Sequence, residues 1–239
     1  MTADAVVPAP LLVPVTVPGV YAPQWDTGLL ARALHREGVG SRTEVLDLGT
    51  GSGALAVQAA RLGAQVTAVD ISPLAVLTAR INALLAGQRV RVRRGDLADA
   101  VPGRSYDLVI SNPPYVPSPS ARLPRRARAR AWDAGRDGRA FVDRICAAAP
   151  SVLRPGGVLL IVHSGLCGSQ ATIQQLAAAG LRASITDRVV VPHGPVLRSR
   201  RPWLVRQGLL DSAENREELV VIRAHRPEHQ ATARPAGRG

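Results

Sequence analysis

The residues best suited to chemistry in this sequence are Asn112-Pro113-Pro114-Tyr115, which close the apolar run Tyr106–Asn112. This run alternates like a strand, whereas prolines cannot continue the pairing of a central strand. A residue that precedes a proline is held extended, so Asn112 is displayed where the strand stops pairing. Its amide offers an acceptor oxygen without a charge, and Tyr115 can wall or stack on a planar group. The motif therefore favours binding of a planar amide or amine.

A glycine-rich turn provides a second candidate site. It reads DLGTGSGAL, and its glycines are Gly49, Gly51 and Gly53. The turn lies between a predicted strand and a predicted helix, where glycine permits close approach of the backbone to a ligand. The spacing is neither the GxGxxG dinucleotide fingerprint nor the Walker phosphate loop. A ligand site of another kind, or simply a tight strand–helix turn, remains open at this point.

Three aspartates favour the ligand site. Asp47, Asp70 and Asp96 each close a predicted strand. Asp70 follows Asp47 at close to the ~20-residue spacing at which an acid reaches a ribose hydroxyl pair. Parallel strands end at one edge of a sheet, where open α/β folds bind ligands. An acidic rim disfavours a phosphate-bearing cofactor and suits one with hydroxyls, amines and positive charge.

The elements that must position these residues alternate in type along the chain. Alternation of strands and helices predicts a parallel sheet flanked by helices, and the segment Tyr21–Gly38 adds an amphipathic helix before the first strand, with Asp26 as its expected N-cap. We expect residues 1–18 to be a flexible arm, 19–224 one domain and 225–239 a disordered tail. The predicted strands are Glu44–Thr50, Gln65–Ser72, Arg89–Asp96, Tyr106–Asn112, Gly156–Ser164, Leu181–Val191 and Glu218–Ala224.

Composition limits the class of protein. The chain has 239 residues, of which 46% are hydrophobic, and this is enough for a packed core. No apolar run could span a bilayer and no signal peptide is recognisable, so we expect a cytoplasmic protein. The cysteines and histidines show no metal-ligand spacing, and we predict no metal site.

The net charge of +12 invites a nucleic-acid partner. Every basic residue of the Lys/Arg class is arginine, however, which also suits a bias of the coding sequence. Two segments carry most of the interest, Arg122–Arg130 and Arg198–Arg206. Each is either a docking surface for a partner or a solvated or disordered loop.

Taken in order, the stretches VLDLGTGSG, VDIS, GDL and SNPPY resemble class I S-adenosylmethionine-dependent methyltransferases. The first residues of the domain, GVYAPQWDTGLLARAL, and the later AWDAGRDGRAFVDR and EELVVIRA are similar to the short, single-domain branch of the HemK/PrmC-type protein glutamine methyltransferases. This resemblance implies a Rossmann-like, mostly parallel seven-stranded sheet with helices on both faces and an antiparallel last strand. It covers roughly Gly19–Ala224.

The resemblance also implies roles for individual residues. Asn112 and the Pro113 carbonyl would each accept one N–H of the target amide, with Tyr115 beside it. S-adenosylmethionine would be the cofactor. Its expected contacts are Thr27, Asp47 and Gly49 around the methionine end, Asp70 at the ribose, Asp96 and Leu97 at the adenine, and Asn112, with Gly51 and Gly53 of the glycine turn also binding the cofactor.

The acceptor implied by the resemblance is the Gly-Gly-Gln loop of a peptide-chain release factor, and some relatives need a small activating partner subunit. Adenine N6 in RNA or DNA, reached through the arginine-rich loops, is the alternative acceptor, because it offers the same planar N–H2 group. A small-molecule N-methyltransferase is a third interpretation. A basic binding module without activity is a fourth, and the intact Asn112–Tyr115 motif argues against it.

Overall fold

The computed structural model describes residues 14–120 and 132–228 of the chain. Its centre is a seven-stranded sheet with the strand order β3-β2-β1-β4-β5-β7-β6. The first five strands in this order, β3, β2, β1, β4 and β5, pair in parallel, whereas β7 is antiparallel to both β5 and β6. The bounds are β1 Glu44–Leu48, β2 Gln65–Asp70, β3 Val90–Arg94, β4 Tyr106–Ser111, β5 Leu153–Ser164, β6 Arg182–Pro192 and β7 Arg216–His225. The predicted fold class, including the antiparallel last strand, is confirmed.

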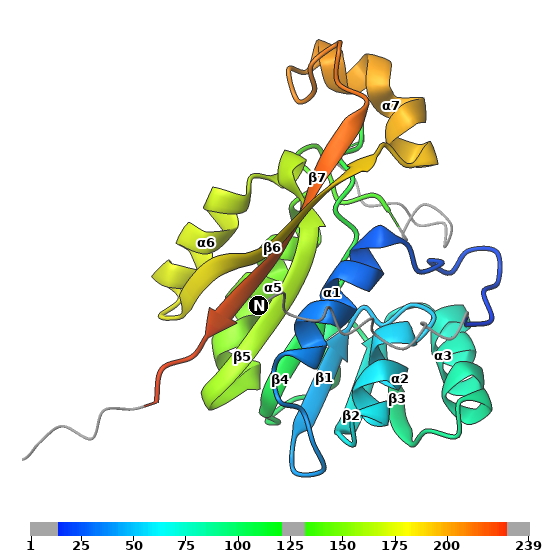
Figure 1. Ribbon diagram of the computed structural model, residues 1–239, viewed down its shortest axis with the longest axis vertical. Helices are drawn as coiled ribbons and strands as arrows, with labels where there is room; N and C mark the ends of the chain where they lie inside the picture. The colour runs from blue at the N-terminus through cyan, green and yellow to red at the C-terminus, as the bar shows by residue number, and fades with distance from the viewer. Residues whose placement is uncertain (1–13, 121–131, 229–239) are drawn as a thin grey trace, which may run out of the picture.

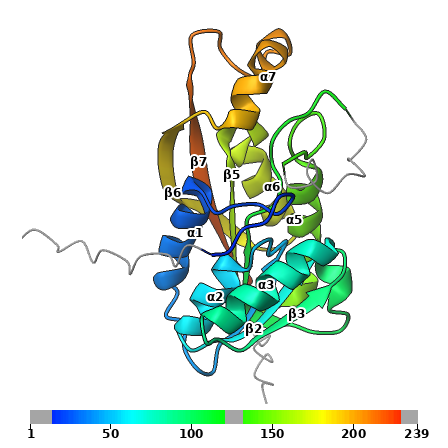
Figure 2. The same ribbon diagram turned by 90° about the vertical axis from the view of Figure 1, so that its right-hand side faces the viewer.

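Helices cover both faces of this sheet (Figures 1 and 2). One face packs against α1 (Trp25–His35), α2 (Ala54–Arg61) and α3 (Pro73–Leu85). The other face packs against α5 (Ala140–Val152) and α6 (Ser169–Ala178). A further helix, α7 (Pro195–Arg206), joins β6 to β7 and projects beyond the strand ends in Figure 1. Two 3-10 turns, η1 (Leu97–Ala100) and η2 (Gly165–Cys167), follow β3 and β5.

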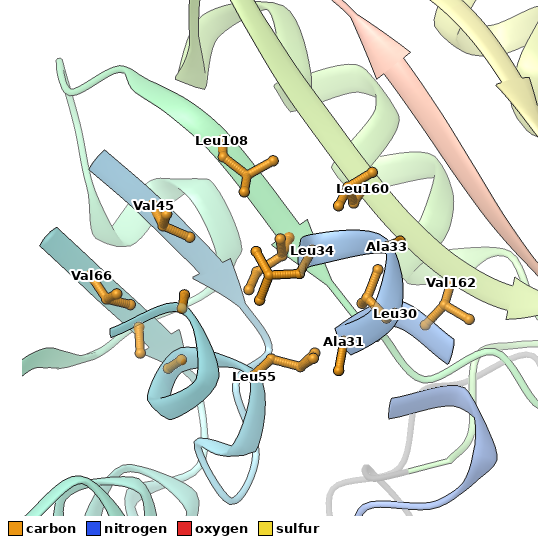
Figure 3. Close-up of a cluster of buried hydrophobic side chains, with 14 of the residues drawn as sticks. Leu30, Ala31, Ala33, Leu34, Val45, Leu55, Val66, Leu108, Leu160 and Val162 are labelled. Carbon is orange, nitrogen blue, oxygen red and sulfur yellow. The ribbon is translucent and has the colours of Figure 1, made fainter. Parts of the chain in front are cut away.

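The hydrophobic cluster on the first face fixes α1 over the centre of the sheet. Leu30 and Leu34 are fully buried, at 0% exposure each. Figure 3 shows them beside Leu108 of β4 and Leu160 of β5, with Leu55 of α2 completing the contact. Burial of a leucine side chain stabilises a fold by roughly 1.5–3 kcal/mol. The packing of α1 therefore fixes the position of its first turn relative to the carboxyl ends of the strands.

The glycine turn and α3 show why the sequence folds this way locally. Gly53 has φ +81° and stands at the start of α2, where a Cβ would lie 2.9 Å from the Cβ of Ala79. Only glycine permits this close approach of α2 to α3. Helix α3 begins at Pro73 behind Ser72, whose Oγ accepts from the N–H of Ala75. Proline at the first helical position and serine at the N-cap are the expected start signals.

The first and last described residues of the chain are hydrogen-bonded to the domain. The main chain of Val15 accepts from and donates to the Asn82 amide, at 2.9 and 2.8 Å. Asn82 Nδ2 also donates to the Ser52 carbonyl at 2.8 Å. Strand β7 ends at His225, and Arg226 donates to the carbonyls of Pro150 in α5 and of Leu153, the first residue of β5. The division into arm, domain and tail stays a prediction, and residues 1–13 and 229–239 lie outside the described residues.

Two expectations about helices are corrected. The N-cap of α1 is Gln24 rather than Asp26, which lies inside the first turn and makes other hydrogen bonds. The basic segment Arg198–Arg206 is part of helix α7 and not a loop. In the part of the chain that the structure describes, no helix has the length and apolar character needed to cross a membrane.

Candidate active site

A cavity of about 530 Å3 opens at the carboxyl edge of the sheet. The glycine turn, the ends of β2, β3 and β4, the first turn of α1 and the start of α7 all contribute to its walls. Because parallel strands end together at this edge, residues far apart in sequence meet here. Nine of the predicted site residues line the cavity: Thr27, Gly49, Gly51, Asp70, Asp96, Leu97, Asn112, Pro113 and Tyr115.

Asp47 and Gly53 do not line the cavity but lie behind its wall. Asp47 is 1% exposed, and its Oδ2 accepts from the Thr50 hydroxyl at 2.6 Å. Burial raises the pKa of Asp47 to about 7, although the Thr50 hydrogen bond acts in the opposite direction. Asp47 therefore supports the glycine turn from beneath, and Gly53 permits the α2–α3 contact described above. Direct contact of either residue with a cofactor stays a prediction.

Asp70 is arranged to accept hydrogen bonds from a ligand. Its Oδ2 accepts from the N–H of Gly51 at 2.9 Å and its Oδ1 from the N–H of Ser72 at 2.8 Å. Burial raises the pKa of Asp70, and these backbone donors oppose the rise. Each carboxylate oxygen has capacity for a further bond. The two backbone bonds fix the orientation of the carboxylate, so the remaining capacity can serve a hydroxyl pair.

Asp96 and Leu97 occupy the end of the cavity beyond Asp70. Asp96 Oδ2 pairs with Arg144 Nη2 at 2.9 Å, and both side chains are about two-fifths exposed. Leu97 has φ +47°, and it is the non-glycine residue with positive φ among those that the structure describes. A leucine in this region is strained, and such strain persists where the surroundings impose it. The strained turn places Leu97 on the cavity wall.

A directed chain of hydrogen bonds holds the Asn112 side chain. Asn112 Nδ2 donates to Thr27 Oγ1 at 3.2 Å, and the Thr27 hydroxyl donates to Asp26 Oδ1 at 3.2 Å. The same Asp26 oxygen accepts from the N–H of Thr27 at 2.6 Å. Because Asp26 only accepts when ionised, the Thr27 hydroxyl must donate to it and accept from Asn112. Within the described ranges, Asn112 Oδ1 has no protein partner, and it remains available as an acceptor in the cavity.

Two tyrosines complete the environment of Asp26. Tyr21 and Tyr115 donate their hydroxyls to Asp26 Oδ2 at 2.6 and 2.8 Å. Burial, and next the charge of Asp26, raises the pKa of both phenols above its ordinary value, so both remain donors. The Tyr21 ring also meets Trp132 edge to face, with centroids 5.1 Å apart. Four hydrogen bonds to one carboxylate that is 2% exposed make this end of the cavity rigid.

Several cavity residues lie outside the predicted set. Asp26 was identified in the sequence only as a helix cap, whereas it is the centre of the network that orients Asn112. Glu217 at the start of β7 and the residues Gly194–Leu197 also line the cavity. The gap between the predicted strands Leu181–Val191 and Glu218–Ala224 is long enough for a helix, and this length could have indicated α7. No local signal marked Glu217, because antiparallel pairing of β7 brings it to this edge.

Three of the four arginines of α7 have partners in the described part of the chain. Arg200 contacts the Asp133 carboxylate and donates to the Pro117 carbonyl at 2.9 Å. Arg198 donates to the His193 carbonyl at 2.8 Å, and Arg201 to the Glu214 carbonyl at 3.3 Å. The contacts of Arg200 attach α7 to the chain that follows β4, whereas Arg198 and Arg201 bond to the segments on either side of α7. The other basic segment, Arg122–Arg130, lies outside the described residues, and nothing here supports a nucleic-acid partner.

Comparison with known proteins agrees with this geometry. Residues 14–123 match the profile of the Methyltransferase small domain family. A Methanocaldococcus jannaschii protein, provisionally named as a protein N5-glutamine methyltransferase, is 35% identical over 176 residues, which are 73% of this chain and 87% of the relative. The release factor glutamine methyltransferase of Bordetella pertussis is 43% identical over 69% of this chain, and the match spans 64% of its own length.

A solved structure agrees at the level of the fold. The Mtq2–Trm112 complex of E. cuniculi, described as responsible for methylation of the eRF1 translation termination factor, aligns with a TM-score of 0.60. The alignment covers 87% of this chain and 99% of the solved chain, at 23% identity. The protein has the class I methyltransferase fold, and its chain belongs to the S-adenosylmethionine-dependent protein glutamine methyltransferases of the HemK/PrmC type.

Proposed function

We propose that this enzyme transfers a methyl group to the side-chain amide nitrogen of a glutamine in a peptide-chain release factor. The observation that carries the proposal is the fixed amide of Asn112, whose Nδ2 is held by Thr27 and whose Oδ1 faces the cavity. A carboxamide acceptor is uncharged and planar, and it needs acceptors for two N–H groups. Asn112 Oδ1 and the Pro113 carbonyl supply them.

The cavity residues fit S-adenosylmethionine. Gly51 has φ +57°, and a Cβ there would meet only Tyr21 Cβ, at 3.8 Å, so the turn leaves room beside its backbone. Asp70 presents a fixed carboxylate for ribose hydroxyls, and Asp96 and Leu97 line the region beyond it. The glycine turn has neither the GxGxxG nor the Walker spacing, which suits a cofactor without phosphate. When bound, this cofactor supplies an electrophilic methyl group on a positively charged sulfur.

The residues of this chain would act by orientation and by hydrogen bonding. The lone pair of an amide nitrogen is delocalised into the carbonyl, so the nitrogen is a poor nucleophile. Asn112 Oδ1 and the Pro113 carbonyl accept its two N–H groups and favour positive charge as it develops there. Tyr115, fixed by Asp26, confines the plane of the amide. Both acceptors are set before reaction, so they contribute through position and electrostatics.

The acceptor, the partner and the location extend this proposal. Relatives named for release factor methylation support a release factor as the acceptor, although this chain spans less than two thirds of the Bordetella protein. The solved complex with Trm112 supports a small partner subunit for this enzyme as well. A release factor acts in translation, so we place the enzyme in the cytoplasm.

Labelled transfer to defined acceptors tests the proposal. The protein is incubated with methyl-labelled S-adenosylmethionine and a release factor, with and without a candidate partner subunit. A release factor whose Gly-Gly-Gln glutamine is replaced by glutamate serves as the matched control, and an adenine-containing oligonucleotide is tested beside it. We expect label on the glutamine of the first acceptor alone. Label on the oligonucleotide, or equal label on the glutamate variant, overturns the proposal.

A further inference from the structure

Glu217 is a buried carboxyl that the proposed methyl transfer does not yet use. It is the second residue of β7 and lines the cavity, although it is only 8% exposed. Its Oε2 is buried and has no hydrogen-bond partner in the described part of the protein. A buried hydrogen-bond acceptor left without a donor destabilises the fold, and such groups are rare in native proteins. A ligand that brings a donor into the cavity would remove this cost.

The surroundings of Glu217 place it at the end of the cavity where Asn112 is held. The charge of Asp26 acts on Glu217, and the charge of Glu217 acts in turn on Tyr21 and Tyr115. Tyr21 and Tyr115 are the residues that hold Asp26 beside Thr27 and Asn112. Glu217 thus lies with Asn112 and Tyr115, the residues proposed to bind the substrate glutamine.

We propose that Glu217 is a substrate-binding residue whose Oε2 accepts a hydrogen bond from a main-chain N–H of the peptide that carries the target glutamine. This assignment rests on the proposed function. The two N–H groups of the target carboxamide are taken by Asn112 and Pro113. The donors left on a Gly-Gly-Gln segment are its main-chain N–H groups, and glycine leaves them sterically accessible. A carboxylate can only accept, so it selects a donor over a carbonyl.

The protonation of Glu217 gives this contact a pH dependence. Burial raises the pKa of Glu217 to about 7, with the Ser164 hydrogen bond lowering it and Asp26 raising it further. An N–H donor favours the ionised form, so acceptor binding strengthens as pH rises through this value. Other titratable or polar groups interact with Glu217 from the elements around it: Asp26 of α1, Tyr21 before α1, Tyr115 after β4, Ser164 of β5 and Cys167 of η2.

The test compares Glu217→Gln with Glu218→Gln in the full chain. Glu218 is the next residue, forms an ion pair with Arg188 at the surface and does not line the cavity, so it is the matched control. For Glu217→Gln we expect roughly a tenfold or larger rise in KM and in the Kd of the release factor on the enzyme loaded with S-adenosylhomocysteine. The kcat and the cofactor Kd should change less than threefold, and the rise of kcat/KM through about pH 7 should disappear.

A second measurement removes the donor instead of the acceptor. Gly-Gly-Gln peptides carrying N-methylglycine at each glycine in turn lack one main-chain N–H. One of them should lose affinity for the wild-type enzyme and lose none for Glu217→Gln, because the two changes delete the same hydrogen bond. The peptide comparison on the wild-type enzyme stays informative even where Glu217→Gln is less stable.

The outcomes separate the assignment from the proposed function. Unchanged acceptor affinity in Glu217→Gln, with an active wild-type enzyme, overturns the assignment alone. A matching loss of cofactor affinity also overturns it and places Glu217 at the methionine amine. A pH profile that persists in Glu217→Gln overturns the pH dependence assigned to Glu217. Failure of the wild-type enzyme to methylate any Gly-Gly-Gln acceptor overturns the proposed function and this assignment with it.

Discussion

Asn112 Nδ2 lies 3.2 Å from Thr27 Oγ1, so a side chain at the end of β4 is oriented by the first turn of a helix 85 residues earlier in the chain. Thr27 is in turn fixed by Asp26, which is buried under two tyrosines. The orientation of Asn112 Oδ1 thus depends on the Thr27 hydroxyl, which does not itself need to touch the substrate glutamine. This relationship separates orientation from binding, and mutation can test it.

Thr27→Val should lower kcat of methyl transfer by roughly tenfold to a hundredfold, the scale of a small misplacement of reacting groups. Valine has the shape of threonine but cannot accept from Asn112 Nδ2, so the amide loses its fixed orientation. Thr27→Ser keeps the hydroxyl and should restore most of the rate. Single-turnover transfer measures the effect, and equal rates for the valine and serine variants would show that the hydroxyl does not orient Asn112.

Asn112→Ala should slow transfer by at least ~10²-fold, as expected when one preorganised polar group is lost. Cofactor affinity should fall much less, because Asp70 and the glycine turn remain in place. Asn112→Asp keeps the shape and an acceptor oxygen, so some activity should survive and the cofactor should bind at least as well. Wild-type rates in Asn112→Ala would reduce Asn112 to a strand-end residue and exclude this mechanism.

Asp70→Ala should weaken S-adenosylmethionine binding by roughly 1.5–3 kcal/mol, the range for hydrogen bonds to a charged acceptor. Asp99→Ala is the control, because Asp99 is an exposed residue of η1 that does not line the cavity. Titration calorimetry measures both. Because Asp70 also holds the N–H groups of Gly51 and Ser72, Asp70→Asn, which keeps one carbonyl oxygen, should lose less. Unchanged affinity in Asp70→Ala would exclude the ribose assignment.

Asp47→Asn should change how stability depends on pH. The pKa of Asp47 rises from 3.8 to about 7 in the folded state, so the folded protein binds this proton more tightly than the unfolded chain. The contribution of Asp47 to stability is therefore fully present below pH 4 and is lost as pH rises to about 7. Relative to Asp47→Asn, the wild-type protein should lose stability across this range. Denaturant unfolding at several pH values measures the difference, and a constant difference would contradict the raised pKa.

The positions and ends of the central strands along the chain could be predicted. Strands β1, β2, β4 and β5 carry apolar runs, β3 alternates, and each stops close to Asp, Gly or Pro. The same signals located Asp70, Asp96 and Asn112, since each stands next to such a boundary. Asp26 was misassigned because an aspartate ahead of an apolar helical pattern has the signature of an N-cap. Its actual role depends on two tyrosines that only the folded chain brings to it.

Helix α7 was missed for a different reason. It contains Pro202 in its interior and arginines at four positions, and both features resemble a polar loop in sequence. What holds it is tertiary: Leu197 and Leu204 pack with Val116 in a small apolar cluster, and Arg200 contacts Asp133. Such contacts between distant segments leave no periodic trace that local reasoning could use.

The attachment of Val15 to Asn82 has a consequence for turnover. Gly19, Val20 and Tyr21, which follow this attachment, form one wall of the cavity, and Asp70 at the end of β2 also lines it. The wall is joined to α3 and to the glycine turn through the three hydrogen bonds of one asparagine side chain. Substitution of Asn82 should therefore loosen the segment before Tyr21 and speed the exchange of spent cofactor for fresh, while Tyr21 stays on Asp26 and β2 keeps Asp70 in place.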